Sequence, residues 1–129
     1  MSNLQDVADL SLLEIWGEDV RARRVQGERI TLAIVELAPN AIVPEHRHAN
    51  EQCGLVIEGE VRFRIGDEER LLGPGGTWRI LGDTPHQVVT GPEGAVVIDV
   101  FAPARADWDD RPTVGTADEP AELVWPRAR

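Results

Sequence analysis

The sequence predicts an all-β protein, built as a small antiparallel sandwich or barrel, and three observations support this fold class. Short apolar segments recur along the chain and are separated by turn residues. Twelve glycines and nine prolines interrupt the 129 residues, which favours many short strands over long helices. Apolar and polar residues alternate in several segments, as is typical of strands with one buried face.

Ten strands are expected, and the turns between them contain glycine, proline, asparagine or aspartate. The clearest turns are Gly-Pro-Gly-Gly at 73–76 and Gly-Pro-Glu-Gly at 91–94. The expected strands span residues 13–16, 20–26, 29–37, 42–48, 52–58, 61–65, 69–72, 77–80, 85–90 and 95–101. Strands at this close spacing predict an antiparallel sandwich or barrel.

Length and composition predict a single domain over residues 1–129, because the chain is long enough for one buried core. We expect the barrel core at about 13–103, preceded by an N-terminal arm at 1–12. The apolar pattern stops in the C-terminal tail at 104–129, which is expected to wrap the surface with Trp108 and Trp125 as attachment points.

A net charge of −10 and a pI near 4.6 oppose binding to nucleic acid or to anionic membranes. No apolar stretch has the length of a membrane span, and no signal-peptide pattern is visible, so a soluble cytoplasmic protein is expected. A single cysteine, Cys53, allows no internal disulfide, which is consistent with a reducing compartment. We expect Cys53 to be a small buried apolar residue.

The three histidines of the chain fall in two short segments. His46 and His48 are separated by one residue in an expected strand, so both imidazoles project to the same face. His86 follows Pro85 at the start of another strand. Three imidazoles and one oxygen donor suit a divalent ion such as zinc, nickel, iron, manganese or cobalt.

Two neighbouring side chains offer the oxygen. Gln52 is expected to share the face of the histidines and would supply a neutral amide oxygen, whereas Glu51 would supply a charged one from the opposite face. With Gln52, the metal keeps its full double charge and acts as a stronger Lewis acid. Glu51 remains the alternative donor.

A carboxylate interrupts the apolar run at 95–101. Alternation places Asp99 on one face with Val97 and Phe101. A buried carboxylate costs several kcal/mol unless it is paired, protonated or hydrated. Asp99 is therefore either held by an arginine or backbone amides, or used in a cavity. Arg105 is a candidate partner for Asp99 or for an anionic ligand.

Two segments resemble the sequence motifs of the cupin family. His46-x-His48-x-x-x-Gln52 followed by Gly59 is similar to the first cupin motif, and 75–86, GGTWRILGDTPH, is similar to the second. The resemblance covers roughly residues 28–101 and implies a double-stranded β-helix, a jelly-roll barrel, with the metal near its mouth. It implies His46, His48, Gln52 and His86 as metal ligands, although Gln52 stands where cupins usually have Glu.

The pattern Asp99-x-Phe101-x-x-x-Arg105 resembles the small pectin-degradation cupins, which convert unsaturated uronates to linear ketones. That resemblance implies that Asp99 moves a proton, Arg105 holds the substrate carboxylate and Phe101 packs against the sugar. Small cupins commonly pair through sheet edges, so a homodimer is expected.

The expected function is therefore a mononuclear metal-dependent enzyme, of isomerase or lyase type, acting on a small anionic, sugar-derived substrate by proton transfer without redox. Two alternatives remain: an iron-dependent dioxygenase, and a non-catalytic module that binds a small ligand or metal. The chain has no tyrosine, which excludes cupin chemistries that depend on a tyrosine ligand, base or crosslink.

Overall fold

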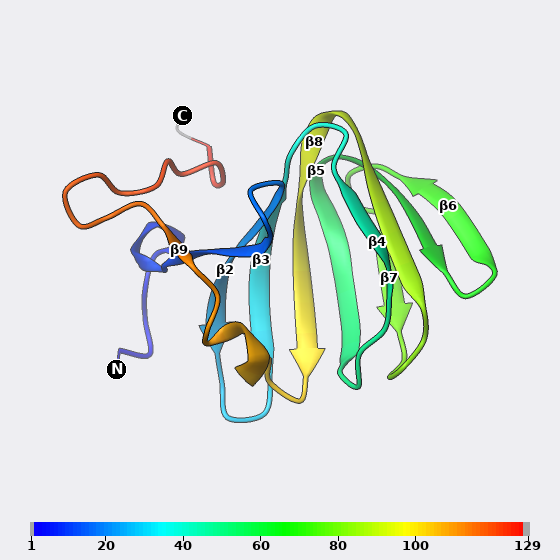
Figure 1. The fold of residues 1–129 in the computed structure, drawn as a ribbon, viewed down its shortest axis with the longest axis horizontal. Coiled ribbons are helices and arrows are strands. Elements are labelled where there is room, and N and C mark those ends of the chain that lie inside the picture. Colours follow the sequence, from blue (N-terminus) through cyan, green and yellow to red (C-terminus); the bar gives the residue numbers. More distant parts are fainter. Residues whose placement is uncertain (1, 128–129) are drawn as a thin grey trace.

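The computed structural model describes residues 2–127, which form mostly antiparallel strands (Figure 1). Two short 3-10 helices, η1 (Val7–Asp9) and η2 (Ala106–Trp108), accompany them. The strands are β1 (Leu12–Trp16), β2 (Val20–Gln26), β3 (Thr31–Leu37), β4 (Ile42–His46), β5 (Glu51–Ile65), β6 (Glu68–Leu72), β7 (Thr77–Ile80), β8 (His86–Ala102) and β9 (Thr113–Val114). This is the antiparallel all-β fold that the sequence pattern predicts, in the jelly-roll form that the resemblance implies.

The long strands β5 and β8 pair with each other along most of their length and belong to both layers of the sandwich. The first half of β5 pairs with β7, and the second half of β8 continues through β3 and β2 to β1 and β9. The other halves form the second layer with β6 and β4. The two layers are therefore one continuous sheet folded over a common core.

Glycine permits the bend in this central pair. The register of β5 against β8 shifts between Val56 and Glu58 and again between Gly59 and Val61. Gly59 has φ of +81°, and a Cβ at this position would collide with the carbonyl oxygen of Gly94. Because the bulges absorb the bend without ending the ladder, the strands expected at 52–58 and 61–65 are one strand. The same holds for 85–90 and 95–101.

The core lies between the layers and is apolar apart from the site described below. Its buried residues include Val35, Val56, Val61, Phe63 and Ile80. On β5, Gln52 and Val56 point into this core, whereas Cys53 is exposed on the outer face. The expectation of a buried Cys53 is therefore wrong.

Both terminal segments cover the outer side of β1 and β2 (Figure 1). The buried Arg23 donates to the carbonyl of Leu10 at 2.7 Å and to that of Glu122 at 3.4 Å, which ties both segments to β2. The tail also contributes strand β9, and Trp108 is only 3% exposed within the core. The tail thus does more than wrap the surface, because its first part closes one side of the barrel.

In the described part of the chain, no helix has the length and apolar character needed to cross a membrane.

Candidate metal centre

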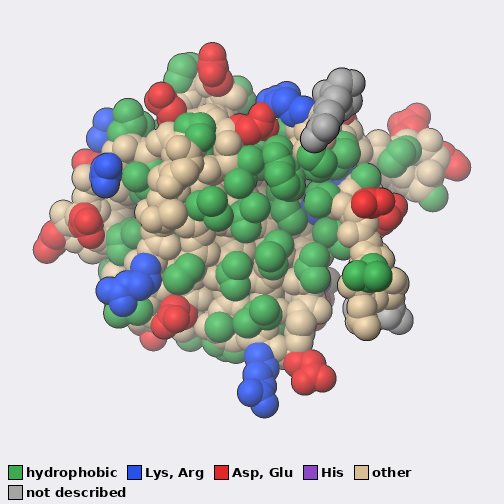
Figure 2. All heavy atoms as spheres, turned by 180° about the vertical axis from the view of Figure 1, so that it is seen from behind, with side chains coloured by type: hydrophobic (Ala, Val, Ile, Leu, Met, Phe, Trp, Pro, Cys, Tyr) green, Lys and Arg blue, Asp and Glu red, His purple; other side chains and the backbone are tan. Residues whose placement is uncertain are grey.

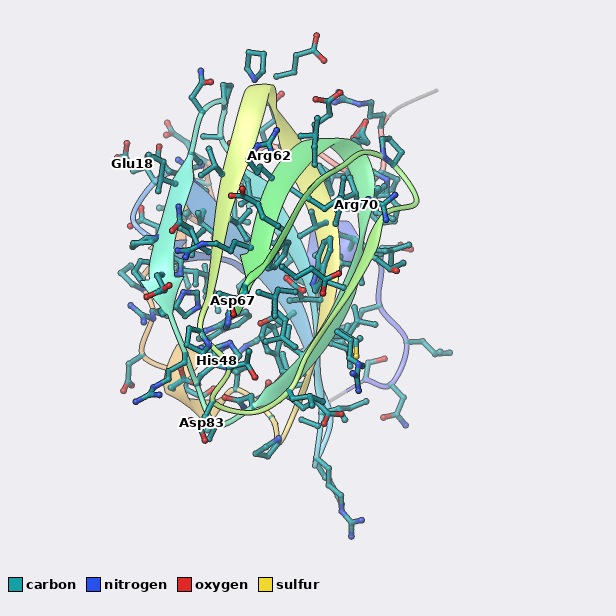
Figure 3. All side chains as sticks on the ribbon, turned by 90° about the vertical axis from the view of Figure 1, so that its right-hand side faces the viewer. Glu18, His48, Arg62, Asp67, Arg70 and Asp83 are labelled. Carbon is teal, nitrogen blue, oxygen red and sulfur yellow. The ribbon has the colours of Figure 1, made fainter. Side chains whose placement is uncertain are left out.

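The three histidines meet inside the barrel, although only two of them lie in strands. His46 ends β4 and lies opposite His86, the first residue of β8, in the antiparallel ladder. His48 follows β4 in the connecting loop rather than in the strand expected there, and its carbonyl accepts from the amide of Asp83 at 2.7 Å (Figure 3). One ring nitrogen from each histidine lies within 4.8 Å of the others.

Backbone carbonyls fix the orientation of all three rings. The Nδ1 atoms of His46, His48 and His86 lie 2.9, 2.9 and 2.8 Å from backbone carbonyl oxygens. A carbonyl oxygen can only accept a hydrogen bond, so Nδ1 carries the proton and donates. The Nε2 atom of each neutral ring therefore carries a free lone pair, which is the arrangement that a metal ligand requires.

The remaining donors at the centre also fit a cation. The Oε1 atom of Gln52 lies 3.1 Å from Nε2 of His48. When Nδ1 of His48 carries the ring proton, neither of these two atoms has a hydrogen, so their lone pairs face each other. The Nε2 atom of His86 is buried and lacks a hydrogen-bond partner among residues 2–127. Three imidazole nitrogens and one amide oxygen form a donor set suited to a borderline divalent metal.

The local electrostatics favour the neutral form of two of these rings, His86 and His48. Burial lowers the pKa of His86 to about 4, with smaller lowering contributions from His46, His48 and Arg105, and the backbone hydrogen bond to Thr84 offsets part of this effect. Burial and then the charge of Arg105 also lower the pKa of His48. Neutral imidazole is the form that binds metal.

Gln52, rather than Glu51, faces the histidines. Gln52 is 7% exposed on the inner face of β5, whereas the neighbouring Glu51 is exposed on the other side. The alternation of side chains along a strand accounts for this difference. The geometry favours the neutral oxygen donor of the two that the sequence left open.

Asp99 lies directly beside this donor set. It is 6% exposed, and its Oδ1 atom accepts hydrogen bonds from Nε2 of Gln52 and from Nε1 of Trp78, both at 2.8 Å. Burial raises the pKa of Asp99 to about 6, and the two hydrogen bonds and the charge of Arg105 oppose this shift. The carboxylate is therefore held by side-chain donors in a cavity, not by backbone amides.

Arg105 pairs with Asp107 instead of Asp99. Its Nε and Nη2 atoms donate to the two carboxylate oxygens of Asp107 at 3.0 and 2.9 Å. Its guanidinium carbon lies 4.7 Å from the ring centroids of both Phe101 and Trp108. Two aromatic faces and one carboxylate thus hold the cation at the edge of the cavity.

The backbone of Arg105 is fastened to β2 and β3. Its amide donates to Oγ1 of Thr31 at 2.8 Å, and its carbonyl accepts from Nη1 of Arg24 at 3.0 Å. Arg24 also pairs with Asp109 at 2.6 Å, just after η2. The segment that carries Arg105 and Trp108 is therefore held in place over the cavity.

One cavity of about 110 Å³ joins these groups. It is lined by the four candidate ligands and also by Asp99, Phe101 and Arg105. Three tryptophans for which no role at the site was predicted also line it: Trp16, Trp78 and Trp108. Trp16 is 40% exposed, and its ring lies 5.2 Å from that of His46, so it flanks the candidate centre.

Known proteins resemble this chain in sequence and fold. Residues 33–101 match the cupin domain model Cupin_2. The chain is 34% identical over 97 residues to the pectin degradation protein KdgF of Dickeya dadantii, a match covering 74% of this chain and 88% of the relative.

Two solved structures share the fold. An RmlC-like cupin from Shewanella frigidimarina superposes with a TM-score of 0.76 at 21% identity, over 83% of this chain and 96% of that one. KdgF from a Halomonas species superposes with a TM-score of 0.68 at 24% identity, over 74% and 88%. Together with the sequence matches, these similarities show that the chain belongs to the cupin family.

Proposed function

We propose that this protein is a metal-dependent cupin enzyme that converts a small unsaturated uronate, or a closely related carboxylated sugar derivative, to its linear ketone form. One observation carries the proposal: the three Nε2 atoms and the amide oxygen of Gln52 share a cavity with a buried carboxylate and an arginine. The similarity to the pectin degradation protein KdgF supports the substrate class.

His46, His48, His86 and Gln52 would hold one divalent ion, whose identity among zinc, nickel, iron, manganese and cobalt stays open. Bound there, the ion would supply Lewis-acid stabilisation of the negative charge that develops on a substrate oxygen. Gln52 is neutral, so the donor set leaves the charge of the ion undiminished. This property favours polarisation of substrate over oxygen chemistry.

Asp99 would move the proton. The conversion of an unsaturated uronate to a linear ketone opens the ring and adds a proton to carbon, with no net oxidation. A general acid or base for such a step needs a pKa near the working pH, and burial raises the pKa of Asp99 to about 6. The cavity places Asp99 beside the candidate metal ligands, where substrate would bind.

Arg105 and Phe101 would position the substrate. The guanidinium of Arg105 offers a planar donor surface for a carboxylate, and its contacts with Phe101 and Trp108 keep that surface oriented. Phe101 is 3% exposed and lines the cavity wall, where its ring would pack against the apolar face of a sugar. The expected substrate is accordingly a small anion.

The direct test is turnover of an unsaturated uronate by the metal-loaded protein, followed through loss of the ultraviolet absorbance of its conjugated double bond. The proposal predicts metal-dependent loss of this absorbance and formation of a ketone product detected by nuclear magnetic resonance. A metal-loaded protein that binds the uronate but leaves it unchanged would show a binding module instead. Oxygen consumption would indicate a dioxygenase.

We also propose that the protein is a homodimer formed through the outer sheet face. Outward-facing side chains of β3, β8 and β5 are apolar and only partly covered, among them Leu32, Ile98, Val100 and Leu55. Figure 2 shows hydrophobic side chains gathered on this face. Light scattering coupled to gel filtration should give twice the 14.2 kDa chain mass, and Val100→Glu should give a monomer. The cytoplasmic location expected from the sequence stays a prediction.

A further inference from the structure

A short chain of side-chain hydrogen bonds connects three neighbouring strands beside the candidate metal centre. Trp78 on β7 donates from Nε1 to Oδ1 of Asp99 on β8 at 2.8 Å. Gln52 on β5 donates from Nε2 to the same oxygen at 2.8 Å. One carboxylate oxygen therefore holds an indole and an amide at once, all within the buried interior.

The bond between Trp78 and Asp99 passes over the strand that separates them. Gly54 on β5 lies opposite Trp78 in one ladder and opposite Asp99 in the other. A Cβ atom at position 54 would lie 2.5 Å from Oδ1 of Asp99 and 2.6 Å from Nε1 of Trp78. The missing side chain of Gly54 thus provides the space in which this hydrogen bond forms.

The chain of bonds selects one of the two orientations of the Gln52 amide. In the observed orientation, the NH₂ group faces Asp99 and Oε1 faces Nε2 of His48. The reversed amide would bring its oxygen against the carboxylate oxygen and point its NH₂ group at the histidines. Oδ1 of Asp99 accepts hydrogen bonds, so the reversed orientation leaves a buried oxygen pair without a proton.

We infer that Trp78 is a positioning residue for metal binding: it fixes Asp99, which in turn holds the Gln52 amide with its oxygen toward the three histidines. Phe63 packs against Trp78 with ring centroids 4.8 Å apart, which keeps the indole in place. This inference rests on the proposed metal centre. It assigns Trp78 and Gly54 a role in metal affinity, although neither is one of the candidate ligands.

Titration of metal-free protein with Co²⁺ tests the inference. Affinity is measured by calorimetry, and the visible absorption of bound Co²⁺ reports its coordination. Trp78→Phe keeps an aromatic ring but removes the N–H donor, so we expect about 10- to 100-fold weaker Co²⁺ binding and an altered visible spectrum. Loss of packing alone would leave the spectrum of bound Co²⁺ unchanged.

Trp108→Phe is the matched control. Trp108 is buried like Trp78 and lines the same cavity. Among residues 2–127, however, its Nε1 has no hydrogen-bond partner. This variant should bind Co²⁺ within about twofold of wild type. Equal Co²⁺ affinity and equal spectra in wild type and Trp78→Phe would overturn the inference, as would equal losses in the two tryptophan variants.

A second pair of variants tests the same chain if Trp78→Phe does not fold. Asp99→Asn keeps an oxygen that accepts from Trp78 and Gln52, whereas Asp99→Val removes it at similar size. Asp99→Asn should bind Co²⁺ at least about tenfold more tightly than Asp99→Val. Equal affinities would overturn the inference. If wild type itself binds no Co²⁺, Ni²⁺ or Zn²⁺, the proposed metal centre is wrong. If wild type binds metal but the variants bind it equally well, only the role of Trp78 is wrong.

Discussion

Arg105 donates two parallel hydrogen bonds to Asp107, two residues further along the chain, with donor–acceptor distances of 3.0 and 2.9 Å. These bonds lower the pKa of Asp107, although its side chain is 58% exposed. The arginine therefore already holds a carboxylate at the edge of the cavity. An incoming carboxylate substrate would meet an arginine that is correctly oriented but partly engaged.

Asp107→Asn should therefore lower KM for a carboxylated substrate about two- to fivefold, because an exposed ion pair contributes about 1 kcal/mol or less. The turnover number should change little, since Asp107 does not line the cavity that contains Asp99. Steady-state kinetics on the unsaturated uronate provide the measurement. An increase in KM would instead show that Asp107 is needed to orient Arg105.

Asp99→Asn should abolish most turnover while the metal remains bound. A positioned general acid or base contributes about 10²- to 10⁴-fold, and an amide cannot replace it. The turnover number is measured on protein whose metal content has been determined by elemental analysis. A fully metal-loaded variant with near wild-type turnover would remove Asp99 from the mechanism.

Metal should stabilise the fold. A ligand that binds only the native state at 100 times its Kd adds about 2.7 kcal/mol, which for a domain of this size raises Tm by about 10 °C. Thermal unfolding with and without Ni²⁺ measures the effect, and His86→Gln is the control because it removes one candidate ligand. An equal rise in this variant would place the bound ion elsewhere.

The inner fold could be predicted because alternation in strands is a strong constraint. Period-two alternation correctly predicted that Asp99 shares a face with Phe101, and both side chains line the cavity. It also correctly placed Gln52 and Glu51 on opposite faces of their strand. The bends in β5 and β8 could not be predicted in the same way. Turn residues such as Gly59 normally end a strand, but here a bulge lets the ladder continue.

The surroundings of the site depend on register, which a sequence does not reveal. Trp78 meets Asp99 only because both lie opposite Gly54 in separate ladders. Asp99 or an anionic ligand was the expected partner of Arg105, but the turn at η2 brings Asp107, two residues further along, to its guanidinium. Sequence reasoning also had no signal for Trp16, whose place beside His46 depends on how β1 meets β4 across the barrel.

Glu36 provides a pH-dependent test of folding away from the candidate centre. Burial raises the pKa of Glu36 above 4.5, and the charges of Arg23 and Arg21 oppose this effect. The carboxyl group of Glu36 therefore holds its proton more tightly in the native state than in the unfolded chain. The free energy of unfolding accordingly falls as pH rises from 4.5 through the native pKa. This cost is absent below pH 4.5 and fully present above the native pKa.

Glu36→Gln removes that cost. The free energy of unfolding of the variant minus that of wild type should therefore be larger at pH 7 than at pH 4. Urea unfolding at both pH values gives the comparison, with Glu93→Gln as the exposed control. A difference from wild type that does not change between the two pH values would contradict the burial effect at Glu36.

Anomalous X-ray diffraction from crystals grown with Ni²⁺ or Co²⁺ tests the central claim most directly. Our account predicts one strong anomalous peak, at about 2.0–2.2 Å from the Nε2 atoms of His46, His48 and His86 and close to Oε1 of Gln52. A metal-bound crystal with no peak among these four atoms, or with its peak elsewhere on the protein, would contradict the account.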